Sequence, residues 1–294
     1  MGVRTKKSNF YMEYGTLGHC ALAYFYAQRM ERKPKWFIDF PDAEKYLERD
    51  ALGNDDRLHD VKQLMEFYAE REKGEPLNAI YCEEEWEATI GEVDPDGKDE
   101  PAEDIEYVEN GEKKVWHHCA LNDEVITCRP DIIAENNGVP VIYDHKVVGI
   151  NKKTGRLTVM NPQYPDLTYH WQAAFNLLVV SKGRCTEAPG ARLPVEEFVL
   201  NRVSRGLPHD VSRDKLDLSP MMVRKLPATV RDAIRRSRIL KKKALLDPKS
   251  LVANFSACNG QYACDYIPLC YSNSVAERDA IAHSQFTFPG SESA

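Results

Sequence analysis

Two aspartates and a lysine, Asp131, Asp144 and Lys146, have types and spacing that could assemble a metal site for phosphodiester hydrolysis. A hard divalent cation such as Mg²⁺ or Mn²⁺ prefers carboxylate and water oxygens, and one or two carboxylates plus a substrate phosphate commonly hold it. The bound ion neutralises charge that develops on the phosphate and lowers the pKa of a bound water. A lysine ammonium can hold that water or stabilise the transition state. These three residues therefore outline a hydrolytic site.

The three residues can meet only if the stretch 125–148, VITCRPDIIAENNGVPVIYDHKVV, folds as a hairpin. Two β-rich runs, ITCRPDIIAE and VPVIYDHKVV, flank Asn137-Gly138, the dipeptide most favoured in two-residue type I′ turns. With that turn, Asp131 lies directly opposite Asp144 across the hairpin. Their Cβ atoms are then roughly 4.5–5.5 Å apart and point to the same side of the sheet.

Alternation along the second strand places Lys146 on the face of the two carboxylates and turns His145 away. Two other interpretations compete with a metal site. A turn at Asn136-Asn137 would instead put Asp131 opposite Ile142. An isolated D-x-K pair is also commonly an ordinary salt bridge on an exposed hairpin face. The second aspartate, the turn and the apolar strands around them favour the metal site.

The motif RPDIIAENNGVPVIYDHK resembles the core of the PD-(D/E)XK nuclease superfamily, in which an aspartate, a turn and D-x-K mark the metal site. Within that superfamily, the sequence most resembles the RecB-like exonucleases, which include phage-encoded members and CRISPR-associated nucleases. Those proteins carry a histidine on an early helix and a glutamine on a helix after D-x-K. Here these are His19 in GTLGHC and Gln172 in YHWQAAFN, and order and spacing agree over roughly residues 15–180.

The resemblance implies an α/β (α+β) fold of the restriction-endonuclease type, in which a mixed central β-sheet is flanked by helices. It also implies a role for each matching residue. Asp131 and Asp144 would bind metal, and His19 would be a further metal ligand or a contact to the substrate end. Lys146 would assist the nucleophile, and Gln172 would position Lys146 or DNA.

Two positions leave the resemblance incomplete. Family members usually have tyrosine four residues after the glutamine, where this sequence has Asn176. A glutamate on the strand before the first aspartate is also frequent in the family. Glu84 or a neighbour in the run Glu83-Glu84-Glu85 could fill that position, and the sequence leaves the choice open.

Hydrophobic periodicity predicts the elements that must position these residues. Apolar residues at helical spacing predict helices over 16–30, 60–72 and 168–181, the first of them capped by Thr16. Period-two alternation predicts strands over 79–90 and 197–203. Strands followed by helices in this order indicate a mixed sheet with helices packed against it.

Charge is distributed unevenly along the chain, whose 39 Lys+Arg and 46 Asp+Glu give a net charge of −7. The segment 92–112 is rich in acidic residues, proline and glycine, which predicts a solvated loop. The segment 224–243 predicts a basic helix, for which a merely solvated face is the alternative to a phosphate-binding one. Such a helix could follow a phosphate backbone without reading sequence, through residues that include Arg231, Arg235, Arg238 and Lys242.

Three of the eight cysteines, Cys258, Cys264 and Cys270, lie within thirteen residues near the end of the sequence. Thiolate clusters favour zinc or iron–sulfur ligation. Several RecB-like nucleases close their fold with a [4Fe–4S] cluster, and the last interval here matches their pattern. Gln261 replaces one usual cysteine, and Cys20 or Cys82 would have to supply the fourth ligand. The alternative is a loop whose thiols are buried as small hydrophobes.

The 294 residues, 43% of them hydrophobic, are enough to bury a sizeable core. We expect an N-terminal helical part over 1–78, a catalytic core over 79–203, and a basic helix with a cysteine loop over 204–294. The sequence lacks an apolar run long enough to span a bilayer and an N-terminal secretory signal, which predicts reduced cysteines and a cytoplasmic location without membrane contact.

Together these features predict a metal-dependent deoxyribonuclease that uses Mg²⁺ or Mn²⁺. By the resemblance, it would be an exonuclease acting on single-stranded DNA or duplex ends in recombination, repair or replication. The first alternative is a non-catalytic nucleic-acid-binding or assembly subunit that retains the fold, although such a subunit would not need the Asp131, Asp144 and Lys146 trio. The second is a structural-metal or redox protein centred on the cysteines.

Overall fold

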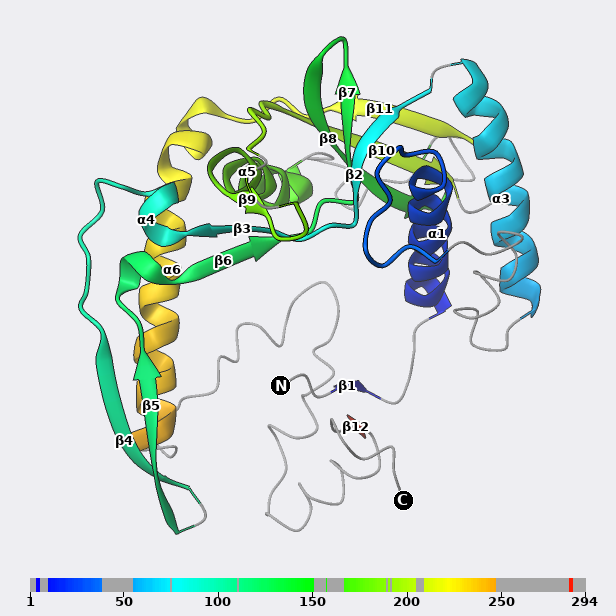
Figure 1. Cartoon of the computed structure of the whole chain (residues 1–294). Helices are drawn as coiled ribbons and strands as arrows, with labels where there is room; N and C mark the ends of the chain where they lie inside the picture. Colours follow the sequence, from blue (N-terminus) through cyan, green and yellow to red (C-terminus); the bar gives the residue numbers. More distant parts are fainter. Residues whose placement is uncertain are drawn as a thin grey trace.

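The structure is a computed structural model that describes residues 4–5, 10–38, 55–74, 76–109, 111–150, 157, 167–188, 190, 192–204, 209–246 and 286–287. Two short strands, β1 (Arg4–Thr5) and β12 (Phe286–Thr287), pair with each other. The other described elements form a central sheet, a smaller sheet and a long hairpin, with helices packed around them (Figure 1).

A mixed five-stranded sheet forms the centre of the molecule. Neighbouring strands are antiparallel except β8 and β10, which are parallel and therefore need a crossover connection. Helix α5 (Leu167–Lys182) lies in that connection. The fold class predicted from the sequence, a mixed sheet flanked by helices, is confirmed. The order is β11-β10-β8-β7-β2, with β2 at Asn78–Cys82, β7 at Ile132–Asn136, β8 at Val139–Val148, β10 at Glu197–Ser204 and β11 at Val211–Lys215.

Helices bury both faces of the central sheet. Helices α1 (Phe10–Ala27) and α3 (Asp55–Gly74) pack on one face, and α5 packs on the other. Along β8, Val141 and Tyr143 join the core beneath α1 and α3, whereas Ile142 joins the core beneath α5. A strand buried on both faces needs a nearly continuous apolar run, and this requirement accounts for the β-branched residues of β8.

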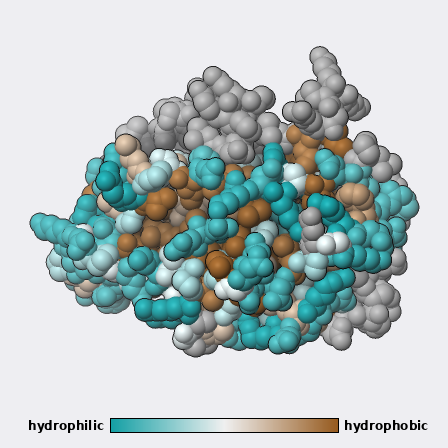
Figure 2. Space-filling view, turned by 90° about the horizontal axis from the view of Figure 1, so that it is seen from above, coloured by the Kyte–Doolittle hydropathy of each residue, from teal (hydrophilic) through white to brown (hydrophobic). Residues whose placement is uncertain are grey.

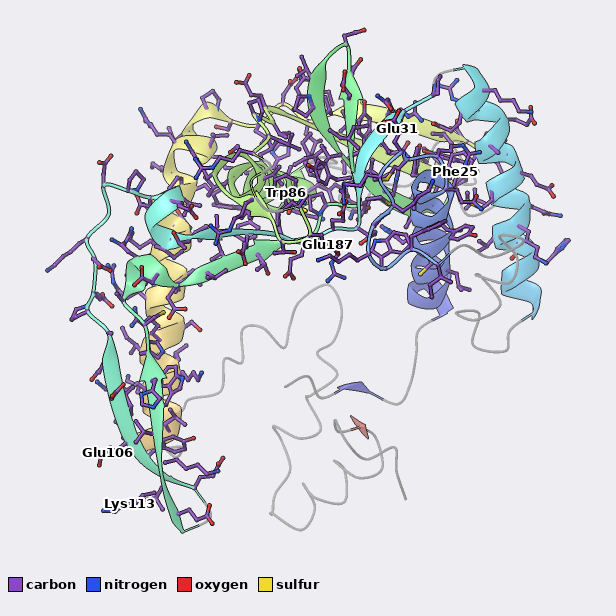
Figure 3. The ribbon with its side chains drawn as sticks, viewed as in Figure 1. Phe25, Glu31, Trp86, Glu106, Lys113 and Glu187 are labelled. Carbon is purple, nitrogen blue, oxygen red and sulfur yellow. The ribbon has the colours of Figure 1, made fainter. Side chains whose placement is uncertain are left out.

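A smaller sheet packs against the other side of α5 (Figure 1). Its strand order is β6-β3-β9, with β3 at Trp86–Thr89, β6 at Val125–Cys128 and β9 at Arg184–Cys185. Trp86, labelled in Figure 3, is fully buried in the core that the two sheets share with α5. Helix α5 is thus enclosed by apolar side chains from both sheets.

Two runs that the sequence presents as single strands are each divided between the two sheets. The predicted strand over 79–90 is wrong, because β2 ends at Cys82, β3 starts at Trp86, and a short helix α4 (Ile90–Val93) follows. Glu83, between the strands, has a left-handed φ of 49°. The run ITCRPDIIAE likewise divides into β6 and β7. The two links lie side by side, since the Glu83 main-chain N–H donates to the Asp131 carbonyl at 3.0 Å.

The helix predictions are confirmed in position, with different ends. Helix α1 begins at Phe10, so Thr16 lies inside the helix, and its prediction as the N-terminal cap is wrong. Helix α3 is longer than the predicted 60–72, whereas α5 and β10 match their predicted ranges to within one residue at each end. Strand β11, from the predicted C-terminal region, adds an edge strand to the central sheet, and the three-part division of the chain stays a prediction.

The predicted solvated loop over 92–112 is wrong in its second half. Strands β4 (Glu103–Glu109) and β5 (Glu112–His118) form a hairpin that runs beside helix α6 (Pro220–Leu246) (Figure 1). Glu106 and Lys113, labelled in Figure 3, are exposed on this hairpin. Helix α6 contains the predicted basic segment, so opposite charges from distant parts of the sequence face one another.

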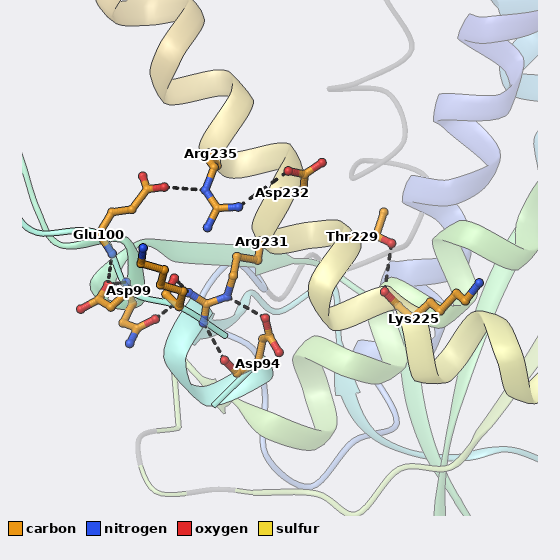
Figure 4. Close-up of polar contacts among 10 residues, drawn as sticks. Asp94, Asp99, Glu100, Lys225, Thr229, Arg231, Asp232 and Arg235 are labelled. Carbon is orange, nitrogen blue, oxygen red and sulfur yellow. Dashed lines mark hydrogen bonds and ion pairs between the residues drawn. The ribbon is translucent and has the colours of Figure 1, made fainter. Parts of the chain in front are cut away.

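Arg231 is the buried centre of this contact, with 4% of its side chain exposed. Its Nε donates to Asp94 Oδ2 at 2.6 Å, and its other nitrogens donate to the Asp94 carbonyl, the Lys98 carbonyl and Asn122 Oδ1 (Figure 4). One turn along α6, Arg235 pairs with Glu100 at 2.5 Å. Carboxylates of the acidic segment therefore neutralise basic residues of α6 within the protein.

Hydrophilic residues cover most of the face shown in Figure 2, and hydrophobic residues show between them. Large exposed apolar side chains include Val108 on the hairpin, Trp171 on α5 and Leu240 on α6. Scattered exposed residues of this kind are usual on soluble surfaces. None of the helices in the described part of the chain is long and apolar enough to cross a membrane.

The contacts of Arg231 predict a large difference between two arginines on one helix. Arg231→Ala removes the buried guanidinium and leaves the half-buried Asp94 carboxylate without its donor, so we expect the free energy of unfolding to fall by about 3 kcal/mol. Arg236, with 75% of its side chain exposed and an i,i+4 pair to Asp232, is the control, and Arg236→Ala should cost less than about 0.5 kcal/mol. Urea unfolding measures both, and similar losses would contradict this account of the hairpin contact.

Candidate active site

The β7–β8 turn has the geometry that the sequence predicts. Asn137 and Gly138 have φ values of 52° and 80°, as a type I′ turn requires at both central positions. Strand pairs run from Asn136↔Val139 to Ile132↔Tyr143. This register is the predicted one, and it excludes the alternative turn one residue earlier. Asp131 lies one residue before the first paired position, so its side chain is not held by the ladder itself.

Asp131 is held instead by one hydrogen bond and one closely placed imidazole, both at its Oδ2 atom. The main-chain N–H of His145 donates to it at 2.6 Å, and His19 Nδ1 from helix α1 lies 3.4 Å away. Burial raises the pKa of Asp131, but the hydrogen bond and charge of His19, with smaller effects of His145 and Lys146, outweigh burial and lower it. The same contact raises the pKa of His19 against its own burial. The contact therefore favours the anionic form of Asp131 and the protonated form of His19.

Asp144, 2% exposed, has a different pair of partners. Lys146 Nζ lies 2.6 Å from its Oδ2, and Gln172 Nε2 from helix α5 donates to its Oδ1 at 2.7 Å. Burial, followed by the charge of Asp131, raises the pKa of Asp144 to about 6. Burial lowers the pKa of Lys146, but the charges of Asp144 and Asp131 outweigh it, and Lys146 stays an ammonium. The predicted trio and Gln172 are thus brought together.

Glu83 joins the site at the link between the two sheets. One ligand atom each from His19, Glu83 and Asp131 lie within 4.8 Å of one another. Burial, followed by the charge of Asp131, raises the pKa of Glu83 to about 7. Its neighbour Glu84 faces away, and both its oxygens accept from Arg32 at 2.5 and 2.7 Å. Which of the three glutamates reaches the site depends on the left-handed backbone conformation at Glu83. The local sequence carries no signal for that conformation.

The donor set fits a divalent metal. Two carboxylates and one imidazole offer oxygen and nitrogen ligands of the kind that Mg²⁺ and, with imidazole, Mn²⁺ accept. A half-buried carboxylate beside a second carboxylate has a raised pKa, as Glu83 does, and a bound cation would stabilise its charged form. Asp144 is not in the three-residue cluster, but its charge interacts with Asp131, and its oxygens face Lys146 and Gln172.

The predicted nucleic-acid contacts on α6 lie elsewhere and are engaged within the protein. Arg231 and Arg235 pair with the acidic segment as described above. Arg238 Nε donates to His118 Nδ1 at 2.6 Å, and Lys242 pairs with Glu103. These four cations contact acceptors of the acidic segment and of the residues that follow it. Whether these residues contact a phosphate backbone stays a prediction.

The predicted cysteine cluster, Cys258, Cys264 and Cys270, lies outside the described residues. Of the two candidates for a fourth ligand, Cys20 is half-buried on α1 beside His19. Cys82 is fully buried, and its Sγ contacts the Ala23 carbonyl at 3.4 Å. Burial raises the pKa of the Cys82 thiol well above its usual range, which opposes the thiolate form that a metal needs.

Comparison with protein families assigns the chain. The model of the PD-(D/E)XK nuclease superfamily matches residues 2–271. The chain belongs to the PD-(D/E)XK nuclease superfamily. Members of this superfamily act on nucleic acids and generally use divalent metals, in agreement with the acidic site described above.

A search among curated proteins returned no match to this PD-(D/E)XK superfamily member. Among solved structures, the chain is similar to a crystal structure from Eubacterium rectale that is named provisionally as an exonuclease. The identity is 12% and the TM-score 0.33, and the match covers 88% of this chain and 100% of the other. At this TM-score, the likeness contributes nothing to the functional argument.

The raised pKa of Glu83 predicts that metal affinity depends on pH. Below pH 7 the carboxyl keeps a proton that the metal must displace, so between pH 6 and pH 8 the apparent Kd for Mn²⁺ should fall at least about tenfold. Displacement of a proton from His19 acts in the same direction. Isothermal titration calorimetry at several pH values, in buffers of different ionisation enthalpy, measures both the affinity and the protons released.

Two variants of the glutamate run test the assignment to Glu83. Glu83→Gln should weaken Mn²⁺ binding and flatten its pH dependence, because the titrating ligand is gone. Glu85→Gln removes a charge two residues away, from a residue that contributes no ligand atom to the cluster. This control should leave the Mn²⁺ affinity and its pH dependence nearly unchanged. Equal effects of the two substitutions would contradict a ligand role for Glu83.

Proposed function

We propose that this protein is a metal-dependent deoxyribonuclease that acts as an exonuclease on single-stranded DNA or duplex ends. The observation that carries the proposal is the pairing of Lys146 with Asp144 at 2.6 Å directly beside the cluster of His19, Glu83 and Asp131. An ammonium next to a group of carboxylates is the arrangement required to activate water against a phosphodiester.

Asp131, Glu83 and His19 would hold the metal, with Asp144 completing the site beside them. When bound, the ion neutralises charge on the phosphate and lowers the pKa of its water. Asp131 is prepared for this role, because its pKa is already lowered and its Oδ2 is fixed by the His145 N–H. Asp144 and Glu83, whose pKa values are raised, gain most from an added positive charge.

Lys146 would act on the attacking water or on the phosphate. One of its three N–H groups faces Asp144 Oδ2, which leaves the others able to donate to an oxygen in the site. Its pKa is raised, so Nζ keeps its proton and stabilises negative charge in the transition state. Gln172 would act as a positioning residue, because its donation to Asp144 Oδ1 leaves Oδ2 directed toward Lys146.

The resemblance to RecB-like enzymes supports work at DNA ends in recombination, repair or replication, and preference for ends is part of this proposal. An iron–sulfur or zinc site at the C-terminal cysteines stays a prediction. A non-catalytic subunit that retains the fold is disfavoured, because burying Asp144 and Lys146 together is costly unless the pair is used.

Degradation of end-labelled single-stranded DNA in the presence of Mn²⁺ tests the enzyme directly. Asp144→Asn leaves the Lys146 ammonium without its counter-ion and should lower the rate at least about a hundredfold. Arg236→Ala, on the exposed side of α6, should cleave at the wild-type rate. A covalently closed single-stranded circle should resist digestion if the enzyme requires an end.

Three results would decide against parts of the proposal. Wild-type protein that binds Mn²⁺ but does not cleave any DNA would favour the non-catalytic alternative. Rapid cleavage of the circle would exclude an exonuclease. Equal rates for wild type and Asp144→Asn would show that the measured activity does not come from this site.

A further inference from the structure

Three polar residues form a row across the central sheet, on the face beneath α1 and α3. His145 on β8 is the register partner of Asn201 on β10, which is in turn the partner of Arg213 on β11. We call these three residues the polar row. His145 and Asn201 are both fully buried, although the core on this face is otherwise mainly apolar. The mechanism proposed above makes no use of these side chains.

Aromatic and acidic side chains from the two helices contact every member of the polar row. Asn201 Nδ2 donates to His145 Nδ1 at 2.6 Å and to the Tyr68 hydroxyl at 2.7 Å. The Tyr68 and Tyr26 hydroxyls are 2.6 Å apart, and the Tyr26 ring stacks on the His145 ring at 5.7 Å with an angle of 9°. At the far end, Arg213 pairs with Glu72 of α3.

Polar residues at these buried positions are less stabilising than apolar residues would be. Asn201 Oδ1 and His145 Nε2 are buried without a hydrogen-bond partner among the described residues. Each such atom costs about 1–3 kcal/mol, and well-packed apolar side chains would avoid that cost. Stability therefore does not account for the polar row.

What the polar row can supply is a defined position for the backbone at His145. The pleat turns the His145 side chain toward α1 and α3, while its neighbours Asp144 and Lys146 face the site on the other side. The His145 N–H points to Asp131 Oδ2 at 2.6 Å. Since Asp131 precedes the first ladder pair, this bond ties its carboxylate to β8. A histidine held from several directions leaves that N–H little freedom.

We propose that the polar row, together with Tyr26 and Tyr68, is a positioning network that holds the His145 main-chain N–H on Asp131 and thereby sets the metal affinity of the site. These residues act through another group and do not themselves touch metal or substrate. The inference rests on the proposed function only in that Asp131 is a metal ligand. Outer hydrogen-bond partners of metal ligands commonly change metal affinity by about 10–100-fold.

Tyr68→Phe tests the network with the loss of a single oxygen atom. We expect the Kd for Mn²⁺, measured by calorimetry on the full chain, to rise about tenfold. We also expect faster hydrogen exchange of the His145 amide relative to its neighbours in β8, because that N–H is held less firmly. Tyr26→Phe removes the next hydroxyl and should shift both measurements in the same direction.

Two controls separate positioning from loss of stability. Tyr143→Phe deletes a hydroxyl from the same buried face of β8, and none of the hydrogen bonds of the described residues involves that hydroxyl, so Mn²⁺ affinity should not change. Val203→Ala opens a cavity in the same core with the network intact, and it should lower the stability but not the affinity. Measurements are made where each variant is fully folded by near-ultraviolet circular dichroism.

The outcomes are distinct from those for the nuclease itself. Unchanged Mn²⁺ affinity in Tyr68→Phe and Tyr26→Phe would overturn the network even if the wild type degrades DNA. An equal loss of affinity in Val203→Ala would also overturn it, since general loosening would then account for the effect. A wild type that never cleaves DNA, combined with weakened Mn²⁺ binding in Tyr68→Phe and Tyr26→Phe but not in Tyr143→Phe or Val203→Ala, would refute the proposed function and uphold the network.

Discussion

Repulsion between closely spaced carboxylates, which have little contact with solvent, is the constraint on which the rest of this structure depends. Asp131 and Asp144 are close enough for the charge of Asp131 to raise the pKa of Asp144, and Glu83 is affected in the same way. A separate partner for each aspartate offsets this repulsion: His19 lies beside Asp131, and Lys146 lies beside Asp144. Several elements must therefore meet at one place: α1 brings the histidine, α5 the glutamine, and β8 the lysine.

The burial of both sheet faces makes this meeting possible. In a strand covered on each side, alternate residues enter different cores, so three successive residues of β8 can serve two environments. Asp144 and Lys146 face the α5 side, while His145 enters the core beneath α1 and α3. The main chain between them carries the N–H that Asp131 accepts. Strand β8 thus links the candidate site to the polar row on the opposite face of the sheet.

Features that depend on local chemistry could be predicted from the sequence. Asn137-Gly138 specifies its own turn, and with the turn come the register and the shared face of Asp144 and Lys146. Glu83 could not be selected from the run of three glutamates, because only the chain's passage between two sheets turns its side chain toward Asp131 and His19. The alternating burial from Cys82 to Ile90 persists through that passage, and for this reason the segment resembles one strand.

Long-range charge pairing was the other feature that could not be predicted, because an acidic segment and a basic helix each look solvated when considered alone. Together they neutralise one another through Asp94, Glu100, Glu103 and their partners on α6. The whole chain has a net charge of −7, and its candidate site is itself acidic. The carboxylates of such a site would repel a phosphate group, whereas Lys146, a protonated His19 and a bound cation would attract it. If the protein uses a metal as proposed, metal binding contributes to substrate attraction as well as to chemistry, and the contacts that hold Asp131 then serve both.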